Sequence, residues 1–231
     1  MKLWVGTSGY SYKEWKGSFY PEDLPNKEML RFYGEQLPAV EINNTFYRFP
    51  KTDVLETWAQ QVPEQFRFVL KASRKITHFK KLKETDDETN YLLENSKTLG
   101  DRLGPILFQL PPYLRKDIDL LKNFLKLLPK DSLSTFEFRH RSWFEEDVFD
   151  ALRGNGSALC IADKDDETDA PVVSTADWGY LRLRRPDYTQ KNLAEWAKKI
   201  ASQNWKEVYV FFKHEDEGAG PKLAKRFIEL K

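Results

Sequence analysis

The chain has 231 residues with a formal net charge of +1, and 40% of its residues are hydrophobic. This length suits one large domain or two small ones, and the near-neutral balance excludes a general electrostatic attraction to nucleic acid or to an anionic membrane. No apolar run is long enough to span a membrane, and the first residues, MKLWVGTSGY, lack the apolar core of a signal peptide, so we expect a cytoplasmic protein. The single cysteine, Cys160, lies in the apolar run ALCIA, which predicts a buried thiol.

Eight short runs have the composition of β-strands, and amphipathic helical patterns separate most of them. The strand-like runs are residues 2–6, 39–43, 66–72, 105–110, 134–140, 158–163, 180–184 and 207–213. The helical patterns are residues 26–37, 52–62, 86–103, 117–128, 142–152, 189–202 and 221–230. The pattern at 142–152 opens with Ser142 and has Glu145 three residues on, which predicts a capping box.

This alternation predicts parallel strands that are covered by helices. Eight strands and seven helices fit a single (β/α)8 TIM barrel, an α/β fold, over residues 1–231. The connection between the sixth and seventh strands, residues 164–178, is too acidic and irregular for a helix. A doubly wound open sheet is the alternative, although eight parallel strands are many for it in a chain of this length.

The barrel prediction also assigns directions to side chains. Alternate residues of a barrel strand point inward, and the outward set is apolar because helices cover it. In STFEFRH (134–140) the phenylalanines then face outward and Glu137 and Arg139 face inward. The same rule sends Leu159, Ile161 and Asp163 of the sixth strand inward. The inward polar residues gather at the C-terminal ends of the strands, and they are Glu41, Asn43, Lys71, Gln109, Glu137, Arg139, Asp163, Arg182 and Lys213.

Such a ring of charges suggests acid/base chemistry. The C-terminal mouth is the end where barrel enzymes carry their sites, and charges close together in a partly closed mouth shift one another's pKa. The ring also has a purely structural interpretation, in which the arginines only neutralise the carboxylates.

As an enzyme, the protein would act on a small polar, anionic substrate that carries a sugar, carboxylate or phosphate group. Glu41 or Glu137 is the candidate general base, and Lys71 is the candidate acid or Schiff-base nucleophile. Isomerase, lyase and hydrolase chemistry all fit. The catalytic candidates are Glu41, Lys71, Glu137 and Asp163, and the substrate-binding candidates are Thr7, Ser8, Asn43, Gln109, Arg139, Arg182 and Lys213.

Two glycine-containing loops are candidate anion sites. GTSGYSYKEW (6–15) follows the first strand, where the backbone around Thr7 and Ser8 either holds an anion or forms an ordinary turn. KHEDEGAGPK (213–222) precedes the last helix, at a position where barrels frequently bind phosphate. The acidic run at 215–217 argues against a simple phosphate site there.

The sequence predicts no cofactor. Its three histidines form no paired ligand motif, and no nucleotide-binding fingerprint is present. Glu41, Glu137 and Asp163 are weak candidates for a divalent metal such as magnesium, because Lys71 and Lys213 lie near them in the predicted barrel and would repel it.

A basic segment supports an alternative function. RKITHFKKLK (74–83) is expected at the mouth, where it would suit a nucleic-acid-binding protein or a phosphodiesterase with salt-dependent affinity. A solvated loop balanced by the acidic residues at 84–88 is the simpler interpretation. A ligand sensor without chemistry is a third possibility.

Several long motifs identify a family resemblance. They are VGTSGYSYKEWKGSFYP, VEINNTFYRFP, FRFVLKA followed by THF, LGPILFQLPP, FEFRHRSW and VYVFFKHEDEGAGPKLA. Together they resemble the YecE-like family of the domain-of-unknown-function 72 class, from Gly6 to Phe227. The resemblance implies a TIM barrel and no established reaction, cofactor or catalytic residue. Its relation to sugar isomerase-like and endonuclease IV-like barrels is one of fold alone.

Overall fold

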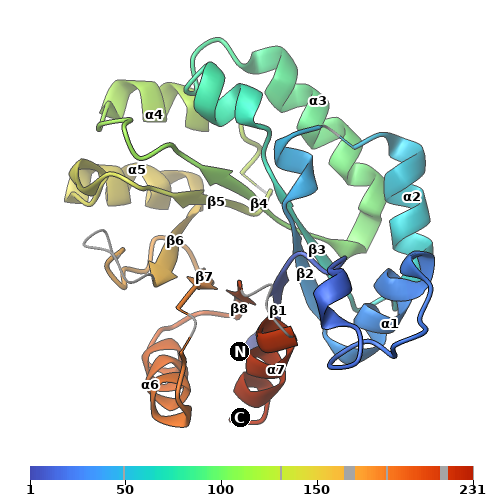
Figure 1. Cartoon of the computed structure of the whole chain (residues 1–231). Helices are drawn as coiled ribbons and strands as arrows, with labels where there is room; N and C mark the ends of the chain where they lie inside the picture. The colour runs from blue at the N-terminus through green and yellow to red at the C-terminus, as the bar shows by residue number, and fades with distance from the viewer. Residues whose placement is uncertain (49, 131, 164–169, 186, 214–217, 231) are drawn as a thin grey trace.

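The computed structural model describes residues 1–230 except 49, 131, 164–169, 186 and 214–217. Within these residues the strands form a closed parallel barrel in chain order (Figure 1). The strands are β1 Lys2–Ser8, β2 Ala39–Ile42, β3 Arg67–Lys71, β4 Leu103–Gln109, β5 Ser134–Glu137, β6 Ala158–Asp163, β7 Trp178–Leu183 and β8 Glu207–Phe212.

Pairing between the first and last strands closes the barrel. β1 pairs with β8 from Lys2 opposite Glu207 to Thr7 opposite Phe212, while its other edge pairs with β2. The predicted TIM barrel is therefore confirmed, and the open sheet is wrong because β1 and β8 leave no free edge.

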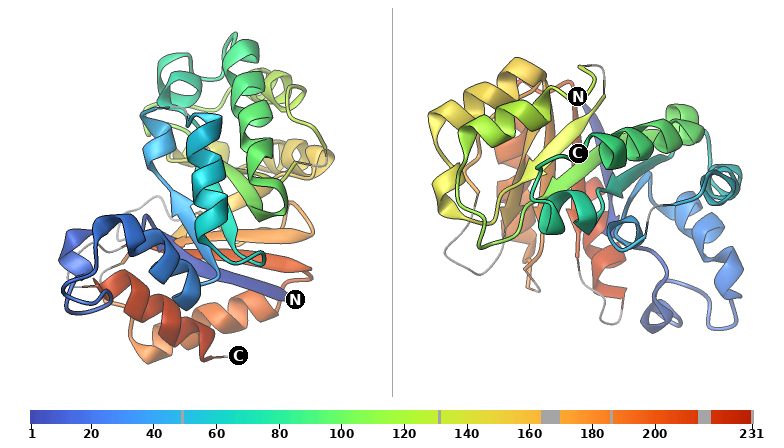
Figure 2. Two further views of the ribbon diagram at one scale, coloured as in Figure 1. Left: turned by 90° about the vertical axis from the view of Figure 1, so that its right-hand side faces the viewer. Right: turned by 90° about the horizontal axis from the view of Figure 1, so that it is seen from above.

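Helices cover the outside of the barrel, as the alternating pattern predicts (Figures 1 and 2). The two ends of the chain lie on the same side of the molecule, next to α7. The helices are α1 Met29–Gln36, α2 Thr52–Gln61, α3 Asp86–Ser96, α4 Ile118–Leu125, α5 Glu146–Asn155, α6 Gln190–Ala201 and α7 Ala219–Ile228. No helix of the described residues is both long and apolar enough to cross a membrane.

Two predicted helices differ most from the structure in their bounds. The pattern at 86–103 is α-helical only to Ser96 and continues as a 3-10 helix, η5 Lys97–Arg102, in which Gly100 has a φ of 54°. The capping box at Ser142 is wrong, because α5 begins at Glu146. Ser142 instead lies in a short 3-10 helix, η6 Arg141–Trp143, which the side chain of His140 caps.

The connection between β6 and β7 is irregular where the structure describes it. Residues 170–177 contain no helix. The first part of the predicted irregular segment, 164–169, lies outside the described residues.

The barrel interior is a packed apolar core below the mouth. The Trp4 and Tyr209 rings stack there with centroids 6.1 Å apart. The barrel is therefore filled by side chains, so polar chemistry is confined to its C-terminal end. The buried interior residues are Ala39, Val69, Leu107, Ala158, Cys160, Trp178, Tyr180, Tyr209 and Phe211.

The prediction that Leu159 and Ile161 of β6 point into the barrel is wrong. Cys160 is in the interior cluster, whereas Leu159 and Ile161 pack in the layers between the strands and the helices. The rule that the apolar face of a strand points outward gives a direction only when the other face is polar. In β6 both faces are apolar, so the rule gives no direction there. The large rings of Tyr180 and Tyr209 fill the interior, so the small residues of β6 face inward and the large ones outward.

Candidate functional site

One buried arginine lies at the centre of the mouth. Arg182 of β7 is 1% exposed and points inward. Its Nη2 lies 2.6 Å from Oε1 of Glu41 on β2, and its Nη1 pairs with Oε2 of Glu137 on β5. A single guanidinium therefore bridges two carboxylates that come from different parts of the barrel.

Neighbouring strands occupy the remaining carboxylate oxygens. The Tyr180 hydroxyl donates to Oε2 of Glu41 over 2.6 Å, and the Gln109 amide donates to Oε2 of Glu137 over 2.8 Å. Oε1 of Glu137 accepts from Nε of Arg139 over 3.1 Å and has Nη1 of Arg184 at 3.8 Å. Every carboxylate oxygen of the pair thus has a cationic or hydrogen-bonding partner.

These contacts keep both carboxylates ionised. Burial alone would raise the pKa of Glu41, but Arg182 and the Tyr180 hydroxyl hold it below its ordinary value. Burial would likewise raise the pKa of Glu137, yet Arg182, Arg184 and Arg139 hold it well below.

Lys71, at the end of β3, is the unusual cation of the site. It is 9% exposed, and it forms no ion pair among the described residues. Burial, followed by the charge of Arg182, lowers the pKa of Lys71 to about 7. Neutral and charged forms of this amine therefore coexist near neutral pH.

Two short helices build the surroundings of Lys71. Thr45, in the 3-10 helix η3 Asn44–Phe46, donates to the Lys71 carbonyl over 2.6 Å. This contact fixes η3, and the centroid of the Phe46 ring lies 4.1 Å from Nζ of Lys71. His78, in the π-helix η4 Lys75–Phe79, packs edge-on against Phe46 at 4.9 Å. Burial, followed by Lys71, lowers the pKa of His78 to about 4, so the imidazole is neutral at pH 7.

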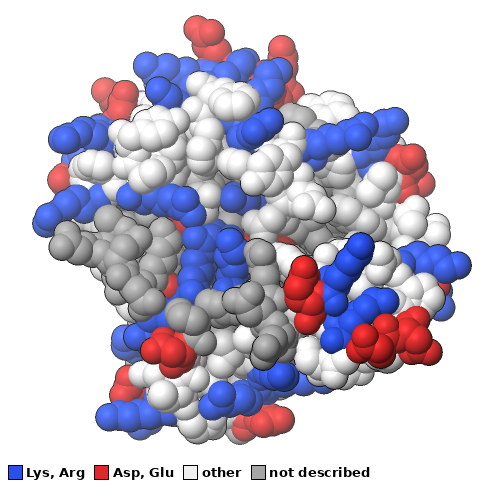
Figure 3. Space-filling model, viewed as in Figure 1, with Lys and Arg blue, Asp and Glu red and all other residues white. Residues whose placement is uncertain are grey.

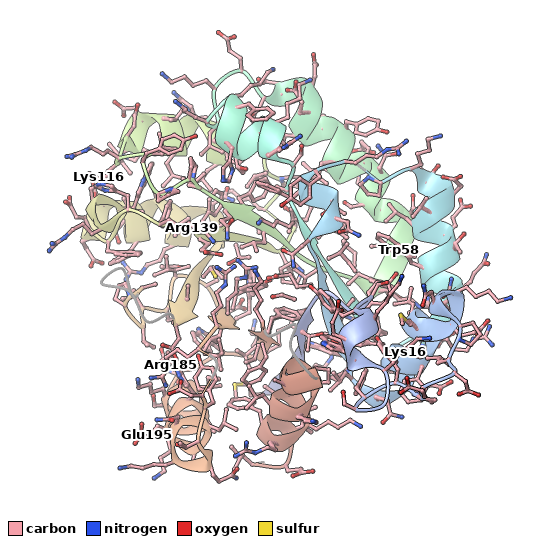
Figure 4. The ribbon with its side chains drawn as sticks, viewed as in Figure 1. Lys16, Trp58, Lys116, Arg139, Arg185 and Glu195 are labelled. Atoms are coloured by element: carbon pink, nitrogen blue, oxygen red, sulfur yellow. The ribbon has the colours of Figure 1, made fainter. Side chains whose placement is uncertain are left out.

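The site carries more positive than negative charge. Two carboxylates face four cations when Lys71 is protonated, namely Lys71, Arg139, Arg182 and Arg184. Figure 3 looks onto this end of the barrel and shows Lys and Arg side chains gathered at the centre of the face. Figure 4 labels Arg139 there, above Arg185. The excess charge and the partial exposure of Arg139 favour binding of an anion from solution.

The structure brings together six of the predicted site residues. All six are linked by the contacts above or by their effect on the pKa of Lys71 or Glu137. They are Glu41, Lys71, Gln109, Glu137, Arg139 and Arg182.

Asp163 does not join this cluster, and its predicted inward direction is wrong. It faces α6, where Oδ2 accepts from the Tyr188 hydroxyl at 2.7 Å and from the Trp196 indole at 2.9 Å. Arg185 pairs with the same oxygen at 3.2 Å. The reversed direction of β6 is the physical reason, so Asp163 anchors α6.

Thr7 also points away from the mouth. Its hydroxyl lies 2.8 Å from the Tyr33 hydroxyl of α1 and donates to the Gly9 carbonyl at 2.6 Å. The neighbouring Ser8 is the register partner of Glu41. Ser8 Oγ has no hydrogen-bond partner of good geometry among the described residues, although it lies near enough to lower the pKa of Glu41.

Two further candidates lie at the rim. Asn43 follows β2, is half-buried and lines a pocket beside the mouth rather than the ionic cluster. Lys213 follows β8 and is exposed, with its backbone N–H bonded to the Leu183 carbonyl. The acidic run 215–217 lies outside the described residues.

Sequence reasoning missed three neighbours of the cluster. Tyr180 lies two residues before Arg182, so the alternation rule itself would have found it. Phe46 and His78 lie in short helices after their strands, and no spacing in the sequence predicts their contact with Lys71 or with each other.

Several basic residues of the segment 74–83 contact side chains of the protein itself. Lys75 and Lys80 pair with Glu88 at 2.7 and 2.9 Å. Arg74 stacks on Tyr47 and Phe79. These contacts do not favour a nucleic-acid interface. In the described part of the chain, no three His, Cys, Asp or Glu side chains are grouped so as to hold a metal ion.

A closed parallel barrel with a polar cluster at the C-terminal strand ends defines a TIM-barrel protein with its candidate site in the usual position. Comparison with known sequences identifies the family. The chain belongs to the family described as "Protein of unknown function DUF72", which it matches over residues 4–231. The resemblance in the motifs is therefore confirmed.

Relatives of the chain match either nearly all or half of its length. UPF0759 protein YunF of Bacillus subtilis (strain 168) is 24% identical over 229 residues, and the match covers 93% of this chain and 79% of YunF. UPF0759 protein YecE of Escherichia coli (strain K12) is 32% identical over 116 residues, 50% of this chain and 43% of YecE. The crystal structure of a DUF72 family protein from Thermotoga maritima MSB8 superimposes with a TM-score of 0.87 at 25% identity, covering 100% of this chain and 99% of that one.

Proposed function

We propose that the protein is an enzyme that binds a small polar anion at the barrel mouth and transfers a proton with Lys71. The observation that carries this proposal is the position of Lys71 beside the ionic cluster around Arg182. Lys71 is a buried amine without an ion-pair partner among the described residues. General acid/base catalysis is most effective when the pKa of the catalytic group is near the working pH.

In this proposal Glu41 and Glu137 position the cations of the site and do not themselves transfer the proton. Glu41 and Glu137 have all their oxygens occupied and their pKa values lowered, so they are weaker bases than the sequence indicates. Their negative charge holds Arg182 in place and offsets part of the repulsion among the cations. The side chains of Arg139 and Arg184 are 26% and 13% exposed, so these two cations are accessible to a carboxylate or phosphate from solution.

Proton transfer by Lys71 suits isomerase and lyase chemistry next to a carbonyl group. The neutral amine would remove a proton from carbon, and the resulting ammonium would return it to the substrate or to a leaving group. Arg139 would stabilise the negative charge that develops on the substrate oxygen.

The test combines binding with solvent exchange. The purified protein would be titrated with inorganic phosphate, phosphorylated sugars and sugar acids in thermal-shift assays. Stabilising compounds would then be incubated in D2O and followed by ¹H NMR for exchange of a carbon-bound proton. We expect Lys71→Met to slow exchange by about 10²–10⁴-fold, and Arg139→Met to weaken binding.

Lys122→Met is the matched control, because Lys122 is exposed on α4. It should leave exchange and binding unchanged. If no anion in the panel stabilises the wild-type protein, or if Lys71→Met exchanges at the wild-type rate, the proposal is wrong.

A further inference from the structure

Two adjoining pockets lie beside the mouth, on the side of β1 and β2. The inner pocket has a volume of about 190 Å³, and its walls include Gly9, Asn43 and Trp58. The outer pocket has a volume of about 320 Å³ and extends over α1 and α2. Tyr10 and Trp58 line both, and we call the two pockets together the Trp58 groove.

The inner end of the groove lies beside the C-terminal ends of β1 and β2, and β2 carries Glu41 of the ionic cluster. Gly9 directly follows Ser8, and its N–H donates to the Glu41 carbonyl at 2.8 Å. Asn43 follows β2 two residues after Glu41. A molecule with its charged group in the mouth would therefore extend into the groove along these two strand ends.

Two aromatic rings in the groove are held in place. Trp58 of α2 is half-buried and stacks on Phe68 with ring centroids 6.0 Å apart and planes 24° apart. Figure 4 shows Trp58 between α2 and the strands. Tyr10 packs against Tyr33 at 6.3 Å, and its carbonyl accepts from the Tyr20 hydroxyl at 2.5 Å. Both rings are thus rigid surfaces on which a flat ligand face can stack.

The other groove residues supply uncharged hydrogen-bonding groups. The side-chain amides of Asn26, Asn43, Asn44 and Gln61 line the groove and make no hydrogen bond to the described part of the protein. Each amide has donors and an acceptor, so it matches hydroxyl groups, which also donate and accept. The charged lining residues are Lys27 and Asp53, which are of opposite sign.

This combination is the chemistry of carbohydrate recognition. The C–H face of a sugar ring packs on the negative face of an aromatic ring, while the hydroxyls at its edge bond to amides. An apolar ligand would leave the amides unpaired, and a nucleic-acid backbone would need more cations than the groove contains.

We propose that the Trp58 groove binds the neutral sugar units of a carbohydrate whose anionic group occupies the mouth. This inference rests on the proposed function and names its substrate class as an anionic saccharide. The outer pocket alone reaches the lower end of the range of roughly 300–1,000 Å³ that is usual for small-molecule sites.

Neutral sugars test the groove separately from the mouth. Short neutral oligosaccharides of glucose, xylose, mannose, galactose and N-acetylglucosamine would be screened by saturation-transfer NMR and titrated by calorimetry. We expect at least one to bind, and Trp58→Ala to weaken it by up to about tenfold. Trp58→Phe should restore most of the affinity. Tyr91→Ala, which removes a 48% exposed ring from α3, should have no effect.

A second variant keeps the test valid if Trp58→Ala fails to fold. Asn43→Ala with Asn44→Ala removes two amides that make no hydrogen bond within the described structure, and it should also weaken sugar binding. Inorganic phosphate should bind these groove variants with wild-type affinity. If phosphate binds but no sugar does, or if adenosine binds and sugars do not, the groove inference is wrong and the proposed function stands. If a sugar binds but no anion does, the proposed function is the part that is wrong.

Discussion

At the scale of single residues, the mouth contains both strongly paired and unpaired charge. Arg182 is surrounded by carboxylates, while Lys71 has only an aromatic ring against its ammonium among the described contacts. The two residues should therefore respond to substitution in opposite ways, although both are buried cations in the same site.

Lys71→Met should increase stability at neutral pH. Because the folded-state pKa of Lys71 is lowered from 10.5 to about 7, the unfolded chain binds more protons between these values, and the wild-type stability rises with pH in this window. At about 1.4 kcal/mol per pKa unit, the wild-type protein should gain roughly 3–5 kcal/mol from pH 7 to pH 10.5 relative to Lys71→Met. Urea unfolding at both ends of the window measures this gain, and parallel pH slopes for the two proteins would contradict it.

Arg182→Met should decrease stability. Removing the bridging guanidinium leaves Glu41 buried without its cation, a change that typically costs about 3–5 kcal/mol. Adding Glu41→Gln to this variant should recover part of the loss, because it removes the uncompensated charge. Denaturant unfolding of the single and double variants at pH 7 measures both effects, and an unchanged midpoint in Arg182→Met would show that the ion pairs contribute nothing.

At the scale of elements, the close approach of β1 and β2 positions Glu41. Gly6 is opposite Ala39 in the register, and a Cβ on Gly6 would lie 1.8 Å from the Ala39 carbonyl oxygen. A backbone atom cannot move aside as a flexible side chain would, so this position requires glycine.

Gly6→Ala should therefore destabilise the protein by at least about 3 kcal/mol, the upper range for overpacking. Gly154→Ala is the matched control, since a Cβ in that position of α5 meets no atom within 4 Å. The control should stabilise by about 0.5–1 kcal/mol through helix propensity. Thermal unfolding of both variants checks the pair, and equal melting temperatures would refute the steric argument.

At the scale of the whole molecule, the ionised carboxylates should govern acid unfolding. The pKa values of Glu41 and Glu137 are lowered by folding, so their stabilisation is complete above the ordinary value of 4.5 and is lost as the pH falls toward the folded-state values. Below pH 4.5 the free energy of unfolding should fall by up to about 1.4 kcal/mol per pH unit for each group.

A variant that combines Glu41→Gln, Glu137→Gln and Arg182→Met lacks this network and should show a shallower acid slope than the wild type. Unfolding followed by circular dichroism between pH 5 and pH 2 compares the two proteins. Identical slopes would mean that other carboxylates control acid unfolding.

The fold and half of the site followed from the sequence because β5 and β7 each have one apolar and one charged face. That contrast gives the direction of Glu137 and Arg182. The direction of β6 could not be predicted, because both of its faces are apolar and the choice depends on the volume left by rings of other strands. The pKa of Lys71 could not be predicted either, since it arises from burial and from Arg182, which lies on another strand.

The two ion pairs made by Arg182 should also affect the rate of unfolding. Arg182 is 141 residues from Glu41 and 45 from Glu137 in the chain, so its contact with Glu41 closes only after strands from both halves of the barrel have met. Interactions that form after the folding transition state act mainly on the unfolding rate. On this view Arg182 delays the opening of an assembled barrel, and its loss would shorten the lifetime of the native state while refolding proceeds at nearly the same speed.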